Sequence, residues 1–179
     1  TAVGYQSLDA NTEGHSNVAV GKGSLSANTS ADENTAVGFN ALADNTTGHS
    51  NVAVGACALI TNTTSRDNVG LGFCALHANT TGSRNAASGS LALDSNTTAC
   101  DNTATGYKAL YANTTGAANT AIGNLAGSNV TTGGNNLLLG LDAGRSGTPS
   151  GEITTQSNRI SLGNNSITNA YIRVDWTVT

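Results

Sequence analysis

The sequence predicts an all-β protein, a parallel β-solenoid or β-roll built from 17-residue coils. Three observations lead to this prediction. The chain repeats itself with a fixed period, turn-forming residues stand at fixed places in every repeat, and one repeat is too short for a pair of helices. Asn, Thr and Gly in every repeat also disfavour a helix.

Glycine defines the repeat, because it recurs at one fixed interval without interruption. A glycine at the same place in each coil indicates a turn that needs a positive φ or a close approach of two backbones. The column consists of Gly4, Gly21, Gly38, Gly55, Gly72, Gly89, Gly106, Gly123 and Gly140.

Each repeat contains two short extended stretches, TAVG and the AL that runs towards NTT. Both are bounded by Asn, Gly, Ser and Thr, which form tight turns. We therefore expect two strands and two turns per coil. Coils stacked in parallel, about 4.8 Å apart, give a rod about 38 Å long between Gly4 and Gly140.

Parallel stacking converts every recurring polar residue into a ladder. Stacked Asn amides can hydrogen-bond along a column, and stacked Thr hydroxyls are expected to do the same. The Asn column, which precedes the glycine, is Asn17, Asn34, Asn51, Asn68, Asn85, Asn102, Asn119 and Asn136. The Thr column, which follows it, is Thr12, Thr29, Thr46, Thr63, Thr80, Thr97, Thr114, Thr131 and Thr148.

Two apolar columns are expected to fill a narrow core. One is the Leu after the glycine, from Leu8 to Leu110, which Gly127 and Gly144 replace in the last two repeats. The other directly precedes the glycine and comprises Val3, Val20, Val37, Val54, Leu71, Ile122 and Leu139. Ser88 and Thr105 interrupt the second column, so we expect the array to be weakest there.

Composition favours association of this chain with itself and argues against several other partners. Only 10% of residues are charged and 4% aromatic, and a thin coil of Val, Ala and Leu would leave an apolar face in water, so a homotrimer is expected. A net charge of −4 with scattered Lys and Arg argues against nucleic-acid binding. No apolar run is long enough to suggest membrane insertion. The start at Thr1, in the middle of a repeat, suggests a fragment of a longer polypeptide.

Cys57 and Cys74 stand one repeat apart in the same column, with Cα atoms expected about 4.8 Å apart. That spacing is compatible with a disulfide, and stacked free thiols fit it equally well. Cys100 stands alone in a turn column.

Aromatic residues follow the glycine in every second repeat, as Tyr5, Phe39, Phe73 and Tyr107. Duplication of a two-coil unit explains the alternation. We expect these rings to serve interchain packing or core filling rather than to form a platform for a ligand.

Charged residues recur in the turns, where a plain solvated edge competes with two kinds of site. Glu33 and Asp67, two coils and about 9.6 Å apart, approach the carboxylate separation of an inverting glycosidase. No aromatic-lined groove or inserted loop accompanies them, so no enzyme is expected. His15 and His49 alternate with Asp32 and Arg66 in another column, which indicates a surface rather than a metal site, and no cofactor is expected.

The recurring N-T-T or N-T-S triplets, from Asn28 to Asn113, match the glycosylation acceptor pattern, but their regular place indicates turn architecture. Their paired threonines suggest an ice-binding surface, but the geometry of a strand argues against it. Adjacent threonines point to opposite faces of a strand, so one outward Thr column is too few for a flat ice-binding surface.

The fixed period is lost after Gly147, which suggests two domains. Residues 1–147 form a shaft of nine coils, and residues 148–179 form a short β cap, neck or tip that begins with a loop around Pro149. From Arg159 to Thr179 the pattern predicts two or three short strands, with a turn at residues 163–165.

Two stretches carry a resemblance to known families. The repeats NTAVGFNAL and NTATGYKAL resemble those of bacteriophage tail-fibre proteins and, at a shorter period, the trimeric heads of autotransporter adhesins, which are parallel β-rolls. The tail NRISLGNNSITNAYIRVDWTVT is similar to the stretch before an endosialidase-type intramolecular chaperone domain. That family trimerises its fibre and then cuts the chaperone off, which implies that Thr179 is an autoprocessed C-terminus.

The resemblance implies a structural and host-attachment segment of a trimeric phage tail fibre, located in the virion. Its partners would be two further copies of the chain, upstream fibre or virion components, and a host-surface glycan or protein receptor. Candidate receptor-binding residues at the tip are Tyr171, Arg173, Asp175 and Trp176, although Tyr171 and Trp176 equally suit the closing core of a trimer. The alternatives are a trimeric adhesin on the bacterial surface or outside the cell and, from another class, a tail-spike glycan hydrolase.

Overall fold

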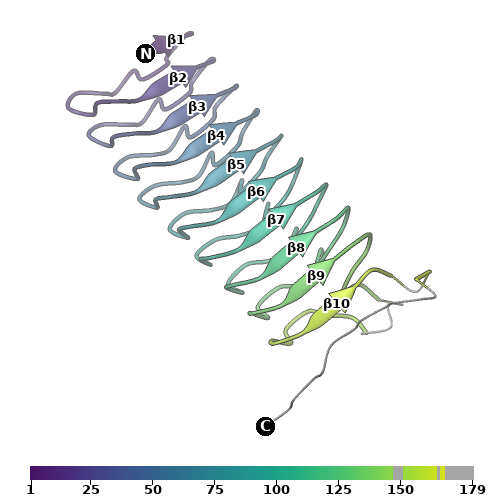
Figure 1. Cartoon of the computed structure of the whole chain (residues 1–179). Coiled ribbons are helices and arrows are strands. Elements are labelled where there is room, and N and C mark those ends of the chain that lie inside the picture. Colours follow the sequence, from purple (N-terminus) through teal and green to yellow (C-terminus); the bar gives the residue numbers. More distant parts are fainter. Residues whose placement is uncertain (147–150, 165, 168–179) are drawn as a thin grey trace.

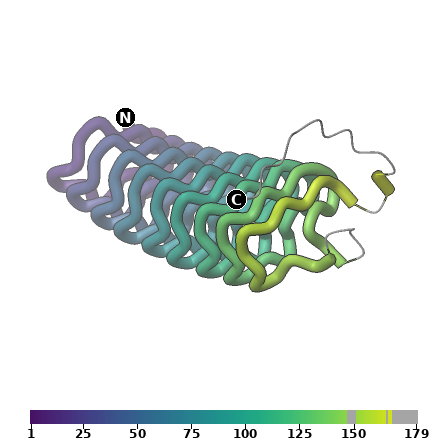
Figure 2. Tube along the Cα trace, turned by 60° about the horizontal axis from the view of Figure 1, so that its bottom comes forward, coloured from purple at the N-terminus to yellow at the C-terminus, as the bar shows by residue number. Residues whose placement is uncertain are grey.

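The chain forms a parallel β-solenoid of 17-residue coils stacked in chain order (Figure 1). The architecture comes from a computed structural model, which describes residues 1–146, 151–164 and 166–167. Within these residues there is no helix, and ten short strands make one parallel sheet with the order β1 to β10. Seen along its length, the coils overlie one another in register (Figure 2).

Each coil contributes one strand to the sheet rather than the two expected. The remaining residues of the coil are turns, whose backbone N–H groups donate to carbonyls of their own or a neighbouring coil. The strands are β1 Ala2–Val3, β2 Val18–Val20, β3 Thr35–Val37, β4 Val52–Val54, β5 Val69–Leu71, β6 Ala86–Ser88, β7 Thr103–Thr105, β8 Thr120–Ile122, β9 Leu137–Leu139 and β10 Ile160–Leu162.

The period changes once, between the last two strands. From β1 to β9 each strand residue pairs with its equivalent in the next repeat, as Val3 does with Val20, whereas Leu137 of β9 pairs with the more distant Ile160 of β10. The sheet therefore continues past a six-residue insertion. Consequently Thr154, and not Thr148, follows Thr131 in the threonine column. The predicted domain boundary at 147/148 and residue 148 itself lie outside the described residues.

The core lies behind the middle residue of each strand, so the expected second core column was wrong. Ala19, Ala36 and Ala53 are fully buried, whereas the residues directly before the glycine face outward. The reason is the alternation of strand side chains: if the middle residue points in, its two neighbours point out. Ser88 and Thr105 therefore do not interrupt the core, because Ala87 and Ala104 occupy it in their coils.

The leucine column is the other wall of the core, as expected, and it has an unusual backbone. Each leucine from Leu25 to Leu110 is fully buried with φ near +50°, a left-handed conformation that is costly for a bulky residue. Burial of the side chain, about 2 kcal/mol, offsets that cost. The members are Leu25, Leu42, Leu59, Leu76, Leu93 and Leu110.

Where this column changes to glycine, the opposite wall compensates. A Cβ on Gly127 would lie 2.6 Å from Leu138 Cδ1, and one on Gly144 would lie 2.5 Å from Leu138 Cδ2. Leu138 stands where most earlier coils have Ala. Its side chain, which comes from the strand, therefore fills the space that leucines at positions 127 and 144 would occupy from the turns.

Two buried asparagine columns, rather than one, hold the turns together. In the expected column, the side-chain oxygen of Asn34 accepts from the backbone N–H of Asn51, and its Nδ2 donates to the carbonyl of Gly48. The second column begins the N-T-T triplets. There Asn45 Nδ2 donates to Asn28 Oδ1 at 3.1 Å and also to Gly48 O. The carbonyl of Gly48 thus joins the two ladders.

The second column is the more regular amide-to-amide ladder of the structure. It runs from Asn11 to Asn113, and its members from Asn28 onward are fully buried: Asn28, Asn45, Asn62, Asn79, Asn96 and Asn113. Burial supports the turn interpretation of the triplets, because a buried amide nitrogen cannot carry a glycan.

The threonine column is also a ladder, but of a different kind from the expected one. Thr46 Oγ1 donates to the backbone carbonyl of Thr63, 3.0 Å away, and the same contact recurs along the column. The hydroxyls therefore bond backbone and not one another.

The glycine column meets both of the conditions suggested for it. Gly55 has φ of +139°, and a Cβ built on it would lie 2.4 Å from the carbonyl oxygen of Gly72 in the next coil. Gly21, Gly38 and Gly72 have the same geometry. The corner of each coil thus requires a residue without a side chain.

We predict that Gly55→Ala lowers the free energy of unfolding by about 3 kcal/mol, because the strained φ and the clash with Gly72 act together. Thermal and urea unfolding would measure the change, with Ala56→Ser as the neighbouring control. A loss no larger than that of the control would contradict this account of the glycine column.

Asn96→Ala tests the second ladder. The amide of Asn96 donates to Asn79 Oδ1 at 2.8 Å and accepts from Asn113 Nδ2 at 2.9 Å, so its removal leaves buried groups unpaired. We expect a loss of about 2 kcal/mol in the free energy of unfolding, measured by urea titration. The matched control is Thr98→Ala, exposed in the same turn, which should change stability little.

Candidate functional site

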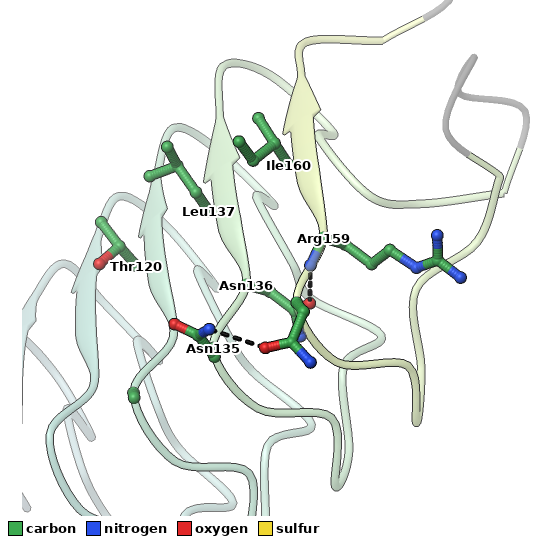
Figure 3. Close-up of a pocket in the computed structure, with 8 residues that line it drawn as sticks. Thr120, Asn135, Asn136, Leu137, Arg159 and Ile160 are labelled. Atoms are coloured by element: carbon green, nitrogen blue, oxygen red, sulfur yellow. Dashed lines mark hydrogen bonds between the residues drawn. The ribbon is translucent and has the colours of Figure 1, made fainter. Parts of the chain in front are cut away.

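A groove of about 330 Å³ lies at the C-terminal end of the solenoid, where the period changes (Figure 3). It runs between the turns and the outer face of strands β8 to β10. Its lining is Ala118, Thr120, Asn135, Asn136, Leu137, Asn158, Arg159 and Ile160. The insertion before β10 brings Asn158 and Arg159 into the places that Asn135 and Asn136 hold one coil earlier.

Hydrogen bonds fix the polar side of this groove. Asn135 Nδ2 donates to Asn158 Oδ1 at 2.7 Å, and the backbone N–H of Arg159 donates to Asn136 Oδ1 at 2.9 Å. The Arg159 side chain points away from the sheet, while Leu137 and Ile160 stand on its outer face (Figure 3). The groove thus combines the amides of Asn135, Asn136 and Asn158 with an apolar side, a set that can bind a polyhydroxylated group.

Sequence reasoning did not identify this groove. Arg159 occupies the place of the asparagine column, but the 23-residue spacing hides the correspondence. Aligning the last coil on its glycine, and not on the fixed period, would have shown the correspondence, because Gly163 stands relative to Arg159 as Gly140 stands relative to Asn136.

The charged turn column forms a paired, exposed edge, as expected. Ser50 Oγ donates to Glu33 Oε2 at 3.1 Å, and Arg66 Nε lies 3.8 Å from Asp67 Oδ2. Glu33 and Asp67 are both exposed. A second groove, of about 230 Å³, includes Glu33 but not Asp67. These two carboxylates therefore do not face one enclosed space.

Arg84 and Asp101 make a two-point ion pair on this edge. Two guanidinium nitrogens donate to the two carboxylate oxygens at 2.7 and 3.0 Å. The hydrogen bond from Arg84 lowers the pKa of Asp101. His15 Nδ1 lies 3.3 Å from Asp32 Oδ1 in the neighbouring column, on the surface as expected. Among the described residues, no group of three or more His, Cys, Asp or Glu could hold a metal ion.

The outward side chains of the strands form a largely apolar surface, here called the apolar wall. It comprises the first and third residues of β2 to β10 together with Val3. The residue before the glycine is 36% exposed at Val20 and 57% at Val3, with Val54, Leu71, Ile122 and Leu162 between these values. Ser88 and Thr105 are the polar residues of this column, which directly precedes the glycine. An exposed apolar surface of this extent is typical of an interaction face.

The aromatic column stands at the corner beside this wall, where the glycine turns the chain. Phe39 and Phe73 are 48% and 55% exposed, so these rings do not fill the core of their own chain. Lysines accompany some of them. Lys22 Nζ lies 5.9 Å from the centroids of both Tyr5 and Phe39, and Lys108 Nζ lies 5.5 Å from that of Tyr107.

The cysteines are free thiols in the structure. Cys57 and Cys74 are half-buried and stand one coil apart in one column. Burial, aided by the nearby Cys57 and Asp94, raises the pKa of the Cys74 thiol to about 11. Cys100 Sγ accepts from the backbone N–H of Ser83.

The predicted tip residues Tyr171, Arg173, Asp175 and Trp176, and the predicted processed end Thr179, lie outside the described residues. They therefore stay predictions. Across the described ranges, the structure contains no helix long and apolar enough to cross a membrane.

Comparison with family models, with curated proteins and with solved structures finds no match to this chain.

We predict that iodoacetamide alkylates native Cys74 at pH 8 about a hundredfold more slowly than an ordinary thiol, because only the thiolate reacts. Peptide mapping by mass spectrometry at several times would give the rates, with the urea-unfolded chain as control. Equal rates for Cys74 in the native and unfolded chains would contradict the raised pKa.

Proposed function

We propose that this chain is a structural and host-attachment segment of a homotrimeric phage tail fibre. The observation that carries the proposal is the apolar wall. Val, Leu and Ile side chains face outward from most of the strands of the sheet, and burying them is strongly favourable at about 25 cal/mol per Å². Three copies around a common axis would remove this wall from water.

The geometry of the wall suits packing along its whole length. Strands of constant length, stacked in one register, give each chain a regular surface without protruding loops between β2 and β9 (Figure 1). A closed ring of three copies would bury it, whereas a single copy would leave it exposed. The resemblance of the repeats to those of tail fibres and trimeric adhesin heads supports the same assembly.

The internal structure suits a load-bearing shaft. Buried amide ladders, threonine contacts and parallel backbone hydrogen bonds join successive coils. The grooves lie on the rod surface, and the carboxylates considered for a glycosidase are exposed and paired. A role in attachment and support therefore fits this surface better than hydrolysis does.

Host attachment is proposed for the C-terminal end. The resemblance assigns this end to the distal tip, a neck or cap that would carry Tyr171, Arg173, Asp175 and Trp176. The groove at Asn158 and Arg159 belongs to the last described coil and supplies donors for a glycan of the host surface. A virion location follows from this role.

The solution mass tests the assembly. We expect light scattering to give about three times the chain mass of 17.8 kDa. Leu71→Glu should give monomers, because Leu71 is an outward residue of β5 and its carboxylate would be buried in the trimer. Thr81→Glu, exposed in a turn away from the wall, is the matched control and should remain trimeric.

A monomeric parent chain would contradict the proposed assembly, and a trimeric Leu71→Glu variant would show that another face forms it. Circular dichroism of both variants would confirm that the coils remain folded.

A further inference from the structure

The aromatic column contains a cation site that the chain fills with its own lysine. Tyr5 and Phe39 stand two coils apart, about 9.6 Å, and Lys22 projects from the coil between them. Its Nζ lies 5.9 Å from both ring centroids, so one ammonium contacts two aromatic rings. Attraction between the cation and each ring quadrupole stabilises this arrangement.

The same arrangement recurs two coils further along the chain without a lysine. Phe39 and Phe73 are spaced as Tyr5 and Phe39 are, and Ala56 takes the place of Lys22 between them. Both rings are about half exposed. Since the Ala56 side chain ends at Cβ, it does not reach the space between the rings. We refer to Phe39, Ala56 and Phe73 as the ring pair.

Neighbouring lysines distinguish this pair from the next one. Phe73 and Tyr107 flank Ser90, but Lys108 Nζ already lies 5.5 Å from the Tyr107 centroid and 4.8 Å from that of Tyr111. A second cation beside Tyr107 would be repelled by this ammonium. In the ring pair, Lys22 approaches Phe39 from the coil on the side away from Phe73, and Ala56 brings no charged group to the other side of that ring.

We propose that the Phe39–Phe73 ring pair binds the ammonium group of a lysine side chain from a partner protein. The ligand chemistry follows from Lys22, which shows that an ammonium on an alkyl chain fits between two rings at this spacing. The negative net charge of the chain, −4, favours approach of a cation. One site is weak, but a trimer would present three copies on one rod, and simultaneous engagement would raise the overall affinity.

This inference goes beyond the proposed function and rests on it only for the number of copies. The composition offers a direct probe, because Phe39 and Phe73 are the two phenylalanines of the chain. Selective ¹³C labelling of phenylalanine would therefore give ring signals from the two sides of the site and no others.

The experiment is an NMR titration of the whole labelled chain with the peptide acetyl-Gly-Lys-Gly-amide. Its copy acetylated at the lysine Nζ is the control, since acetylation removes the charge and leaves the alkyl chain. We expect the signals of both rings to shift together with the lysine peptide, and the acetylated copy to bind about fivefold more weakly.

Two variants make the result specific. Ala56→Lys places a lysine between Phe39 and Phe73, as Lys22 stands between Tyr5 and Phe39. Its ammonium should occupy the ring pair and abolish the shifts. Lys22→Ala should open the Tyr5–Phe39 site and add a shift of Phe39 without loss at Phe73. Neither position belongs to the core or to a ladder.

The proposal is overturned if neither ring responds, if only one does, if both peptides act alike, or if Ala56→Lys leaves the shifts unchanged. Light scattering on the same samples separates the two proposals. A trimer without shifts refutes the ring pair alone, whereas shifts in a monomer refute the assembly alone.

Discussion

From β1 to β9, every coil of this protein repeats the backbone of the coil before it in register, and the rest of the structure depends on that constraint. In-register parallel stacking places each side chain against its counterpart, so a residue is acceptable only if it can meet a copy of itself. Asn can, because its amide both donates and accepts. Gly55 can, because only hydrogen separates it from the carbonyl of Gly72. A charged residue cannot stack favourably on a copy of itself and needs a residue of another kind in the next coil, as Arg84 has in Asp101.

The same constraint explains which parts of the fold could be predicted from the sequence. The period, the parallel sheet, the glycine corner and the Asn17 column follow directly from residues that recur at one interval. The sequence did not predict which side of the strand faces the core, because Val20 is larger and more apolar than Ala19 and therefore resembles a core residue more. Small residues occupy the inner face since leucines such as Leu25, in left-handed turns, fill the space from the opposite wall. That left-handed geometry leaves no signature in the pattern, because leucine rarely adopts it.

The candidate surfaces were less predictable than the fold. The groove at Arg159 depends on an insertion that breaks the period, and the triplet pattern indicates turns without revealing the second asparagine ladder. The exposure of Phe39 and Phe73 depends on the direction in which the chain turns after each glycine. Neighbours along the rod, such as Lys22 with Tyr5, were accessible to sequence reasoning, since their separation is known from the period alone.

The second asparagine ladder, which begins the N-T-T triplets, ends within the rod at Asn113, and this affects the cooperativity of unfolding. Val130 and Ile153 continue the column beyond Asn113 as buried apolar residues, so the side-chain oxygen of Asn113 has no hydrogen-bond partner among the described residues. In a quasi-one-dimensional array, stability is approximately the sum of contributions from each coil and from each boundary between neighbours. The boundary after Asn113 lacks one such contribution. We therefore expect this boundary to be the first at which the last coils separate from the rod, directly beneath the end that we propose for attachment.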